Sequence, residues 1–293
     1  MKKTTNIILL LAATVLTLTG CATNTSQPGG STFDASKTIN VVSREDGSGT
    51  RGAFMELFGI ELKGDDGTKK DMTTKEAVIA KQTDVMMTNI AGDRYGIGYV
   101  SLGSLNDSVK AVLIDGVTAS TENVKNCSYP VARPFNIATK GEPTGLAKDF
   151  IEFILSADGQ AVVAKSYIAI ADNAPAYSGD RPSGKIVVAG SSSVTPIMEK
   201  LKEAYLQVNP NALIEIQQTD SSAGMMGAID RTCDIGMASR ELKDSELVEL
   251  TATQIALDGI AVIVNNGNPV TMLTAEQVRA IFTGEIEEWN KVQ

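Results

Sequence analysis

The chain has 293 residues, of which 43% are hydrophobic and 5% aromatic, and its formal net charge is −9. This length and composition predict a globular α/β protein of two lobes. The acidic charge argues against nucleic acid as a partner, and the absence of histidine excludes histidine-based catalytic triads and histidine-ligated zinc. Three scattered cysteines show no metal-ligand spacing, so no cofactor is expected.

Residues 1–21 have the pattern of a secretory signal, with two lysines, an apolar run and small residues before Cys21. A single transmembrane anchor is the weaker alternative, because the apolar run is short for a bilayer span. The tetrapeptide that ends at Cys21 resembles a bacterial lipobox, which implies cleavage before this cysteine and its lipidation. Residues 22–37 are polar and lack apolar periodicity, so they are expected to form a tether.

Two other cysteines, Cys127 and Cys233, remain in the exported part of the chain. A disulfide is permitted in an oxidising compartment. Pairing cannot be deduced from the sequence, and two isolated, buried small residues are the alternative.

The first predicted functional element is a strand that runs through a polar loop into a helix between Val41 and Phe54. A helix N-terminus carries free backbone N–H groups and partial positive charge, which favour a bound oxyanion. Gly47 and Gly49 leave those groups accessible, and Arg44 can supply a planar cationic fork. The alternative is an ordinary capped helix after a flexible turn.

The same strand, hydroxyl-rich loop and helix recur twice, at residues 186–196 and 213–224. Pro196 suits the first turn of the second helix. The carboxyl ends of strands are where open α/β sheets bind ligands. We therefore expect the three loops to converge on one small anion.

Further elements are predicted by periodicity and capping signals. Strands or extended runs are expected at residues 95–102, 109–114, 129–139, 234–241 and 255–264. Helices are expected at residues 73–80, 144–155 and 274–283, the last opening with a capping box and ending at Gly284. Residues 172–185 have linker composition.

Seven motifs together resemble the phosphate-binding lipoproteins of bacterial ABC phosphate importers. They are Ser43–Arg51, Tyr129–Pro134, Ala189–Pro196, Asp220–Gly224, Asp234–Arg240, Asp258–Val264 and Ile281–Ile286. The resemblance covers nearly all of residues 39–293 and implies a two-lobed type II periplasmic binding fold with the ligand in the cleft between the lobes.

The order of these motifs departs from the usual family order, in which the stretch from Lys185 comes first. The resemblance thus implies a circular permutant, and an incomplete longer chain with a tandem array is the alternative. Lobe B would comprise residues 38–105 plus 268–293, and lobe A residues 106–267. Residues 38 and 293 are expected to lie close together in one lobe.

The resemblance also assigns ligand residues. The implied phosphate ligands are Arg44, Ser48, Gly49, Thr50, Ser192, Ser193, Ser221, Ser222 and Arg240. Asp46 would orient Arg44, although some relatives place a proton-accepting aspartate at the position of Arg240. Selectivity for phosphate over sulfate is therefore left to Asp46, Asp220 or Glu241.

The predicted function is a monomeric, lipid-anchored extracytoplasmic receptor that passes phosphate to the permease subunits of an ABC transporter, without covalent chemistry. A binding protein for sulfate or molybdate is the nearest alternative. A hydrolase with Ser48 or Ser193 as nucleophile would need a base other than histidine, such as lysine. An adhesin or sensor on the same fold is the third alternative.

Overall fold

The computed structural model describes residues 32–63, 69–171 and 173–292. The signal, Cys21 and residues 22–31 of the tether lie outside these residues, so the structure does not bear on them. The described residues from Phe33 to Val292 belong to one compact unit. Within the described part of the chain, no helix is both long and apolar enough to span a membrane.

One mixed sheet organises this unit. Its strands follow the order β10-β9-β11-β8-β12-β5-β1-β4, and β6 pairs with β12. Pairing is parallel among β10, β9 and β11 and among β4, β1 and β5, and it is antiparallel where β8 and β12 join these groups. The strands are β1 (Asn40–Arg44), β4 (Val78–Ala80), β5 (Gly96–Ser101), β6 (Lys110–Ala111), β8 (Ala132–Thr139), β9 (Gly184–Ser191), β10 (Ala212–Thr219), β11 (Ile235–Ala238) and β12 (Thr251–Val264).

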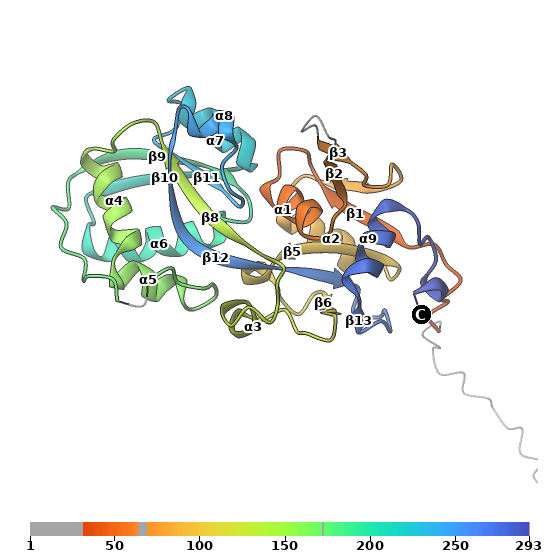
Figure 1. Ribbon diagram of the computed structural model, residues 1–293. Helices are drawn as coiled ribbons and strands as arrows, with labels where there is room; N and C mark the ends of the chain where they lie inside the picture. Colours follow the sequence, from red (N-terminus) through yellow and green to blue (C-terminus); the bar gives the residue numbers. More distant parts are fainter. Residues whose placement is uncertain (1–31, 64–68, 172, 293) are drawn as a thin grey trace, which may run out of the picture. The chain divides into compact units, whose positions relative to one another are not determined.

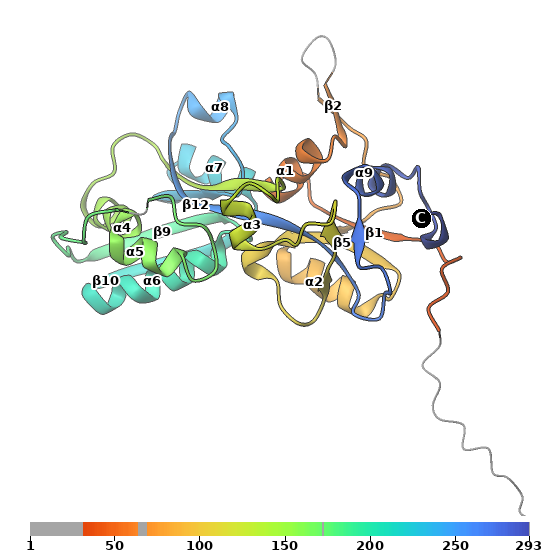
Figure 2. The same ribbon diagram turned by 60° about the horizontal axis from the view of Figure 1, so that its bottom comes forward.

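Helices and short strand pairs surround the sheet. Helices α4, α5 and α6 lie together beside β9 and β10 in both views (Figures 1 and 2). The helices are α1 (Gly49–Leu57), α2 (Thr83–Gly92), α3 (Thr121–Lys125), α4 (Gly145–Leu155), α5 (Ala157–Val163), α6 (Thr195–Val208), α7 (Ser221–Ile229), α8 (Asp244–Leu247) and α9 (Ala275–Thr283), with 3-10 turns η1 (Leu102–Ser104) and η2 (Trp289–Lys291). The strand pairs are β2 (Glu61–Lys63) with β3 (Lys69–Asp71) and β7 (Leu113–Ile114) with β13 (Met272–Leu273).

The buried apolar residues form two main cores, joined by β8 and β12, which run side by side from one to the other (Figure 1). The first core contains Phe54, Tyr99 and Phe282, and the second contains Phe135, Phe150 and Tyr205. A smaller cluster around Met225 lies under α7. The chain is thus two-lobed, as predicted.

The predicted lobe boundaries at residues 105 and 267 do not coincide with the division between the cores. Val109 to Val131 and Ile260 to Val264, which the sequence analysis assigned to lobe A, pack in the first core. The physical reason is that β6 and the end of β12 extend the sheet of the first core through β5.

The two ends of the described chain meet, as expected. Thr38 and Glu288 form an antiparallel bridge, and the Ile39 N–H donates to the Glu287 carbonyl at 2.8 Å. Phe33 also packs against Trp289, with ring centroids 6.2 Å apart.

Several local predictions are confirmed and one is wrong. Thr274 and Gln277 form the predicted capping box, and Gly284 ends α9 in the left-handed conformation at φ 81°. The predicted helix at residues 73–80 is instead a turn followed by β4, because Val78 to Ala80 pair with β1 at the sheet edge. Cys127 and Cys233, whose pairing was open, are both free.

Candidate functional site

Arg44 is the charged centre of the predicted anion site. It ends β1, and its side chain is 2% exposed. Its Nε and Nη2 donate to the two carboxylate oxygens of Glu45, both at 2.8 Å. Nη1 donates to Thr83 Oγ1 at 3.2 Å, and Nη2 also donates to Ser192 Oγ at 2.9 Å. The guanidinium therefore reaches from the first lobe to a loop of the second.

Seven buried hydroxyl groups form a chain of contacts that begins at this arginine through Thr83 and Ser192, and we refer to them as the hydroxyl cluster. Its members are Thr50, Thr83, Ser191, Ser192, Ser193, Ser221 and Ser239, none more than 6% exposed. Thr50 Oγ1 lies 2.8 Å from Ser193 Oγ, and Thr83 Oγ1 lies 3.2 Å from Ser192 Oγ, so pairs form across the two lobes. Ser191 Oγ donates to Ser239 Oγ at 3.0 Å.

Helix N-termini supply the backbone of the cluster. Thr83 and Ser221 are the first residues of α2 and α7, and Thr50 lies in the first turn of α1. Ser192 and Ser193 lie in the turn that precedes α6. First-turn N–H groups lack intrahelical partners and carry partial positive charge. The four helix starts therefore add fixed dipoles that favour an anion.

Glycines in the first loop allow the lobes to come this close. A Cβ on Gly49 would lie 2.5 Å from Ser221 Oγ and 2.8 Å from Ser239 Oγ, and one on Gly47 would overlap the Asp220 carboxylate. The Ser222 N–H donates to the Gly47 carbonyl at 3.2 Å. The glycines thus serve lobe-to-lobe contact as well as backbone access.

The structure brings most predicted ligands together and separates the rest. Arg44, Thr50, Ser192, Ser193 and Ser221 converge, with Gly49 packed against them. Ser48 is the N-cap of α1, and its Oγ accepts from the Arg51 N–H at 3.3 Å.

Arg240 turns away from the hydroxyl cluster. Its Nη1 and Nη2 donate to the carboxylate of Glu246 at 2.8 Å each, and Nη2 also donates to Ser222 Oγ at 3.3 Å. Burial raises the pKa of Glu246, but the hydrogen bond from Arg240 helps to hold it below its ordinary value. The Arg240 guanidinium is therefore paired with Glu246 of α8, and Ser222 is its hydrogen-bond partner rather than a member of the hydroxyl cluster.

The prediction that Asp46 orients Arg44 is wrong. Glu45 holds Arg44, whereas the Asp46 side chain is 96% exposed and pairs with Arg51 at 2.8 Å. Asp220 is the N-cap of α7 and accepts from the Ala223 N–H at 2.9 Å. Neither aspartate has a hydrogen bond with Arg44.

Thr83, Ser191, Ser239 and Glu45 were missed by the sequence analysis. Thr83 was hidden because β4, which places it, was predicted as a helix. Ser239 follows the buried run of β11, and the rule that ligand groups follow strand ends could have found it.

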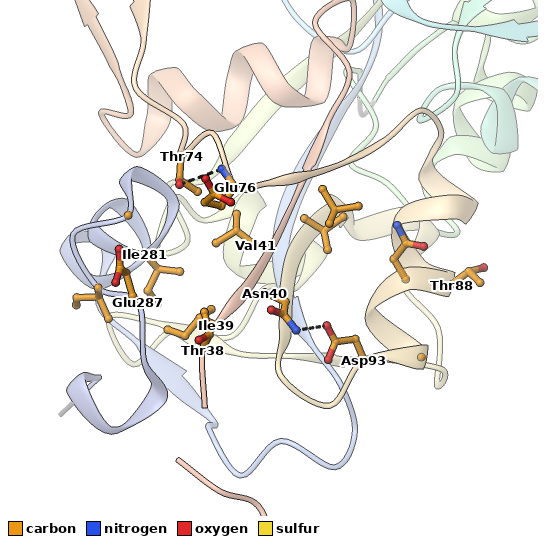
Figure 3. Close-up of a pocket in the computed structure, with 16 residues that line it drawn as sticks. Thr38, Ile39, Asn40, Val41, Thr74, Glu76, Thr88, Asp93, Ile281 and Glu287 are labelled. Carbon is orange, nitrogen blue, oxygen red and sulfur yellow. Dashed lines mark hydrogen bonds between the residues drawn. The ribbon is translucent and has the colours of Figure 1, made fainter. Parts of the chain in front are cut away.

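Two larger cavities lie outside the hydroxyl cluster. A groove of about 850 Å³ between α1 and residues 240–244 is lined by Asp46, Ser48, Ser222 and Arg240, so several of the predicted residues line this groove rather than the hydroxyl cluster. Another of about 810 Å³ lies between α2 and α9 at the opposite end of β1 from Arg44; there Asn40 Nδ2 donates to Asp93 Oδ2 at 2.7 Å (Figure 3). Over residues 32–63, 69–171 and 173–292, no group of three acidic, cysteine or histidine side chains could hold a metal ion.

Comparison with known proteins places this geometry among binding proteins. A family described as a PBP superfamily domain matches residues 11–158 and 175–293. The chain is 53% identical over 275 residues to phosphate-binding protein PstS 2 of Streptococcus agalactiae serotype V, covering 93% of this chain and 92% of that protein. It is 45% identical over 287 residues to phosphate-binding protein PstS 2 of Streptococcus pneumoniae serotype 4, covering 98% of each. The crystal structure of a phosphate ABC transporter, phosphate-binding protein from Streptococcus pneumoniae TIGR4 is 46% identical, with a TM-score of 0.69 over 87% of this chain and 100% of that one.

Proposed function

This chain belongs to the PBP superfamily domain family, and from that premise we propose that it captures inorganic phosphate outside the cytoplasm and delivers it to the permease subunits of an ABC transporter. The observation that carries the proposal is the contact of Arg44 and the hydroxyl cluster across the two lobes. Such a set recognises a tetrahedral oxyanion, because the arginine supplies a fork of donors and each hydroxyl can donate or accept. The names of the relatives support phosphate as that oxyanion.

Each part of the site has a distinct role in this capture. Glu45 accepts a hydrogen bond from Arg44 Nε and so holds one side of the guanidinium in place. The other side, formed by Nη1 and Nη2, then faces Thr83 and Ser192. An anion there would exchange hydroxyl-to-hydroxyl bonds for bonds to its own oxygens. Because the donors come from both lobes, the anion itself would hold the lobes closed.

The arrangement supports binding without covalent chemistry. Ser48 Oγ serves as a helix cap, and Ser193 Oγ lies near Thr50 and Thr83. Within the described residues, neither serine has a hydrogen bond with a lysine that could act as a base. We therefore propose a receptor that releases phosphate unchanged.

Two further parts of the proposal concern the chain itself. Lipidation at Cys21 would anchor a monomeric receptor to the outer face of the membrane. The permuted order is supported by the bridge between Thr38 and Glu288, since it joins the two segments that are continuous in the usual family order. The streptococcal relatives match over 92% and 98% of their lengths, which fits a shared order.

Calorimetry with phosphate, sulfate and molybdate tests the ligand. We expect phosphate to bind with a dissociation constant of about 1 μM or less, which corresponds to about −8 kcal/mol. Sulfate and molybdate should bind at least about 100-fold more weakly, a difference of about 2.7 kcal/mol. Tighter binding of either rival would assign the site to that oxyanion instead.

Incubation with phosphate esters tests the absence of chemistry. No turnover is expected. Steady hydrolysis that Ser48→Ala or Ser193→Ala abolishes would replace the receptor by a hydrolase.

A further inference from the structure

A second buried arginine, Arg133, lies where β8 and β12 pass from one core to the other. Arg133 on β8 and Asp258 on β12 are directly opposite in the strand register. Their side chains are 2% and 1% exposed, and Arg133 Nη2 lies 3.1 Å from Asp258 Oδ2. Val131 and Ile260 beyond the pair belong to the first core, whereas Phe135 and Ile255 belong to the second. Any rotation of one lobe against the other must bend the strands near this pair.

The pair is incompletely satisfied by its surroundings. Arg133 Nε and Nη1 are buried and have no hydrogen-bond partner. The hydroxyl groups of Ser101, Ser104 and Tyr167 lie buried near one another, and none of them has a hydrogen bond of good geometry. Asp258 Oδ1 accepts a long bond of 3.4 Å from the Gly103 N–H, and hydrogen bonding from Ser101 is among the influences that lower the pKa of Asp258. We call these five residues, Arg133, Asp258, Ser101, Ser104 and Tyr167, the junction cluster.

Burial without full pairing opposes the charged state of both partners. Burial, together with the positive charge of Arg44, lowers the pKa of Arg133 to about 10, although Asp258 opposes the change. Burial raises the pKa of Asp258 to about 6, although Arg133 opposes that rise. A buried ion pair with empty hydrogen-bonding positions is commonly no better than a pair of apolar side chains of similar volume. The junction cluster therefore disfavours the lobe arrangement that encloses it.

We propose that Arg133 and Asp258 are positioning residues that favour the open lobes and so set the rate of phosphate release. The proposal rests on the function proposed above. When the lobes rotate apart, the bent strands admit water to the unpaired donors, which lowers the free energy of the open state. When they close, the contacts between Arg44, the hydroxyl cluster and the anion must outweigh the unpaired groups at the junction.

Two variants move this balance in opposite directions. Arg133→Met with Asp258→Val removes both charges and keeps apolar side chains that suit paired strands. The closed state should then be favoured, so phosphate release slows by about 10-fold and affinity rises by a similar factor. Asp258→Asn leaves the buried charge of Arg133 without its counterion, and release should quicken by about 10-fold.

The release rate is measured by rapid dilution of the full protein loaded with radiolabelled phosphate, and small-angle scattering reports the compactness of the empty protein. The empty double variant should be more compact than the empty parent. Asp149→Asn, which disturbs a buried carboxylate in the second core, is the control and should leave the release rate unchanged. Arg133→Lys keeps the charge and should stay closer to the parent than either variant.

The outcomes separate this inference from the proposed function. A parent that does not bind phosphate contradicts the function. A parent that binds, with double and Asp258→Asn variants that both release phosphate at the parental rate, overturns the role of the junction. If the double variant does not fold, an unchanged or slower release from Asp258→Asn alone overturns it.

Discussion

Arg44 and Arg133 are equally buried, at 2% exposure each, yet their surroundings differ. Each guanidinium nitrogen of Arg44 has an acceptor, from Glu45, Ala80, Thr83 or Ser192. Arg133 has one carboxylate contact and the face of Phe135, 5.4 Å from its central carbon to the ring centroid. The difference shows that burial of an arginine does not itself identify an anion site.

What distinguishes the two regions is the type of neighbouring group. Serine and threonine hydroxyls both donate and accept, so the hydroxyl cluster can pair internally or with an anion. A guanidinium only donates, so Arg133 depends on acceptors that the two strands around it do not provide. The hydroxyl cluster near Arg44 can therefore exchange its internal hydrogen bonds for bonds to an anion. The unpaired donors of Arg133 instead favour a rotation of the lobes that exposes them to water.

The largest expected loss of phosphate affinity follows from replacing Arg44. Arg44→Met should weaken phosphate binding by at least about 1,000-fold, because it removes a charge-assisted fork and leaves the half-buried Glu45 carboxylate beside the anion without its partner. Calorimetry measures the loss. Arg279→Met, in an exposed pair with Glu285, is the control and should bind as the parent does. A loss below about 10-fold would show that Arg44 does not hold the anion.

The next largest loss of affinity tests the close contact between the two lobes rather than the charge of the site. Gly49→Ala should weaken binding by about 100-fold, since the new methyl group meets Ser221 and Ser239 at less than van der Waals distance. Gly52→Ala is a matched control in the same helix, where a Cβ meets nothing within 4 Å. It should keep affinity and slightly stabilise α1. Equal affinities for the two variants would contradict the role of Gly49 in closure.

A smaller effect tests a residue that the sequence analysis missed. Ser239→Ala should weaken phosphate binding by about 5- to 10-fold, because the Ser239 hydroxyl is in contact with Ser191, Ser221 and Thr50. Ser128→Ala, on an exposed turn, is the comparison variant. If both bind alike, Ser239 is structural only.

The last prediction concerns Asp149 on α4, a charged group that should affect stability and leave binding unchanged. Asp149 accepts hydrogen bonds from Tyr177 Oη and Tyr205 Oη, each at 2.5 Å. Burial raises its pKa, but these bonds outweigh that effect and hold the pKa below its ordinary 3.8. Its contribution to stability is therefore present above pH 3.8 and is lost as the pH falls through the lower folded value.

Asp149→Asn should lower the free energy of unfolding by about 1–3 kcal/mol at neutral pH and leave phosphate affinity unchanged. Urea unfolding at neutral pH and at a pH below the folded pKa of Asp149 measures the loss of stability. The free energies of unfolding of the parent and the variant should become equal at the lower pH. A difference between them that persists below the folded pKa would mean that the carboxylate charge is not responsible.

The local parts of the fold could be predicted because their signals are contained in short stretches. The loop that starts at Arg44, the capping box at Thr274 and the start of α4 next to Thr144 follow from neighbouring residues. The three hydroxyl-rich loops after strands likewise predicted a shared site, and the resemblance to phosphate-binding lipoproteins assigned Thr50, Ser192, Ser193 and Ser221 to it. Periodicity and capping depend on residues a few positions apart, so the sequence by itself determined these features.

Only the tertiary structure decided which strands pair and which side chains contact the site residues. Val78 to Ala80 are a strand because β1 lies beside them, and that pairing places Thr83 against Ser192. Glu45 rather than Asp46 holds Arg44, since the direction of each side chain depends on the loop as folded. The lobe division and the junction of Arg133 with Asp258 arise where two strands cross between cores, and contacts between residues 125 positions apart leave no periodic signal in the chain.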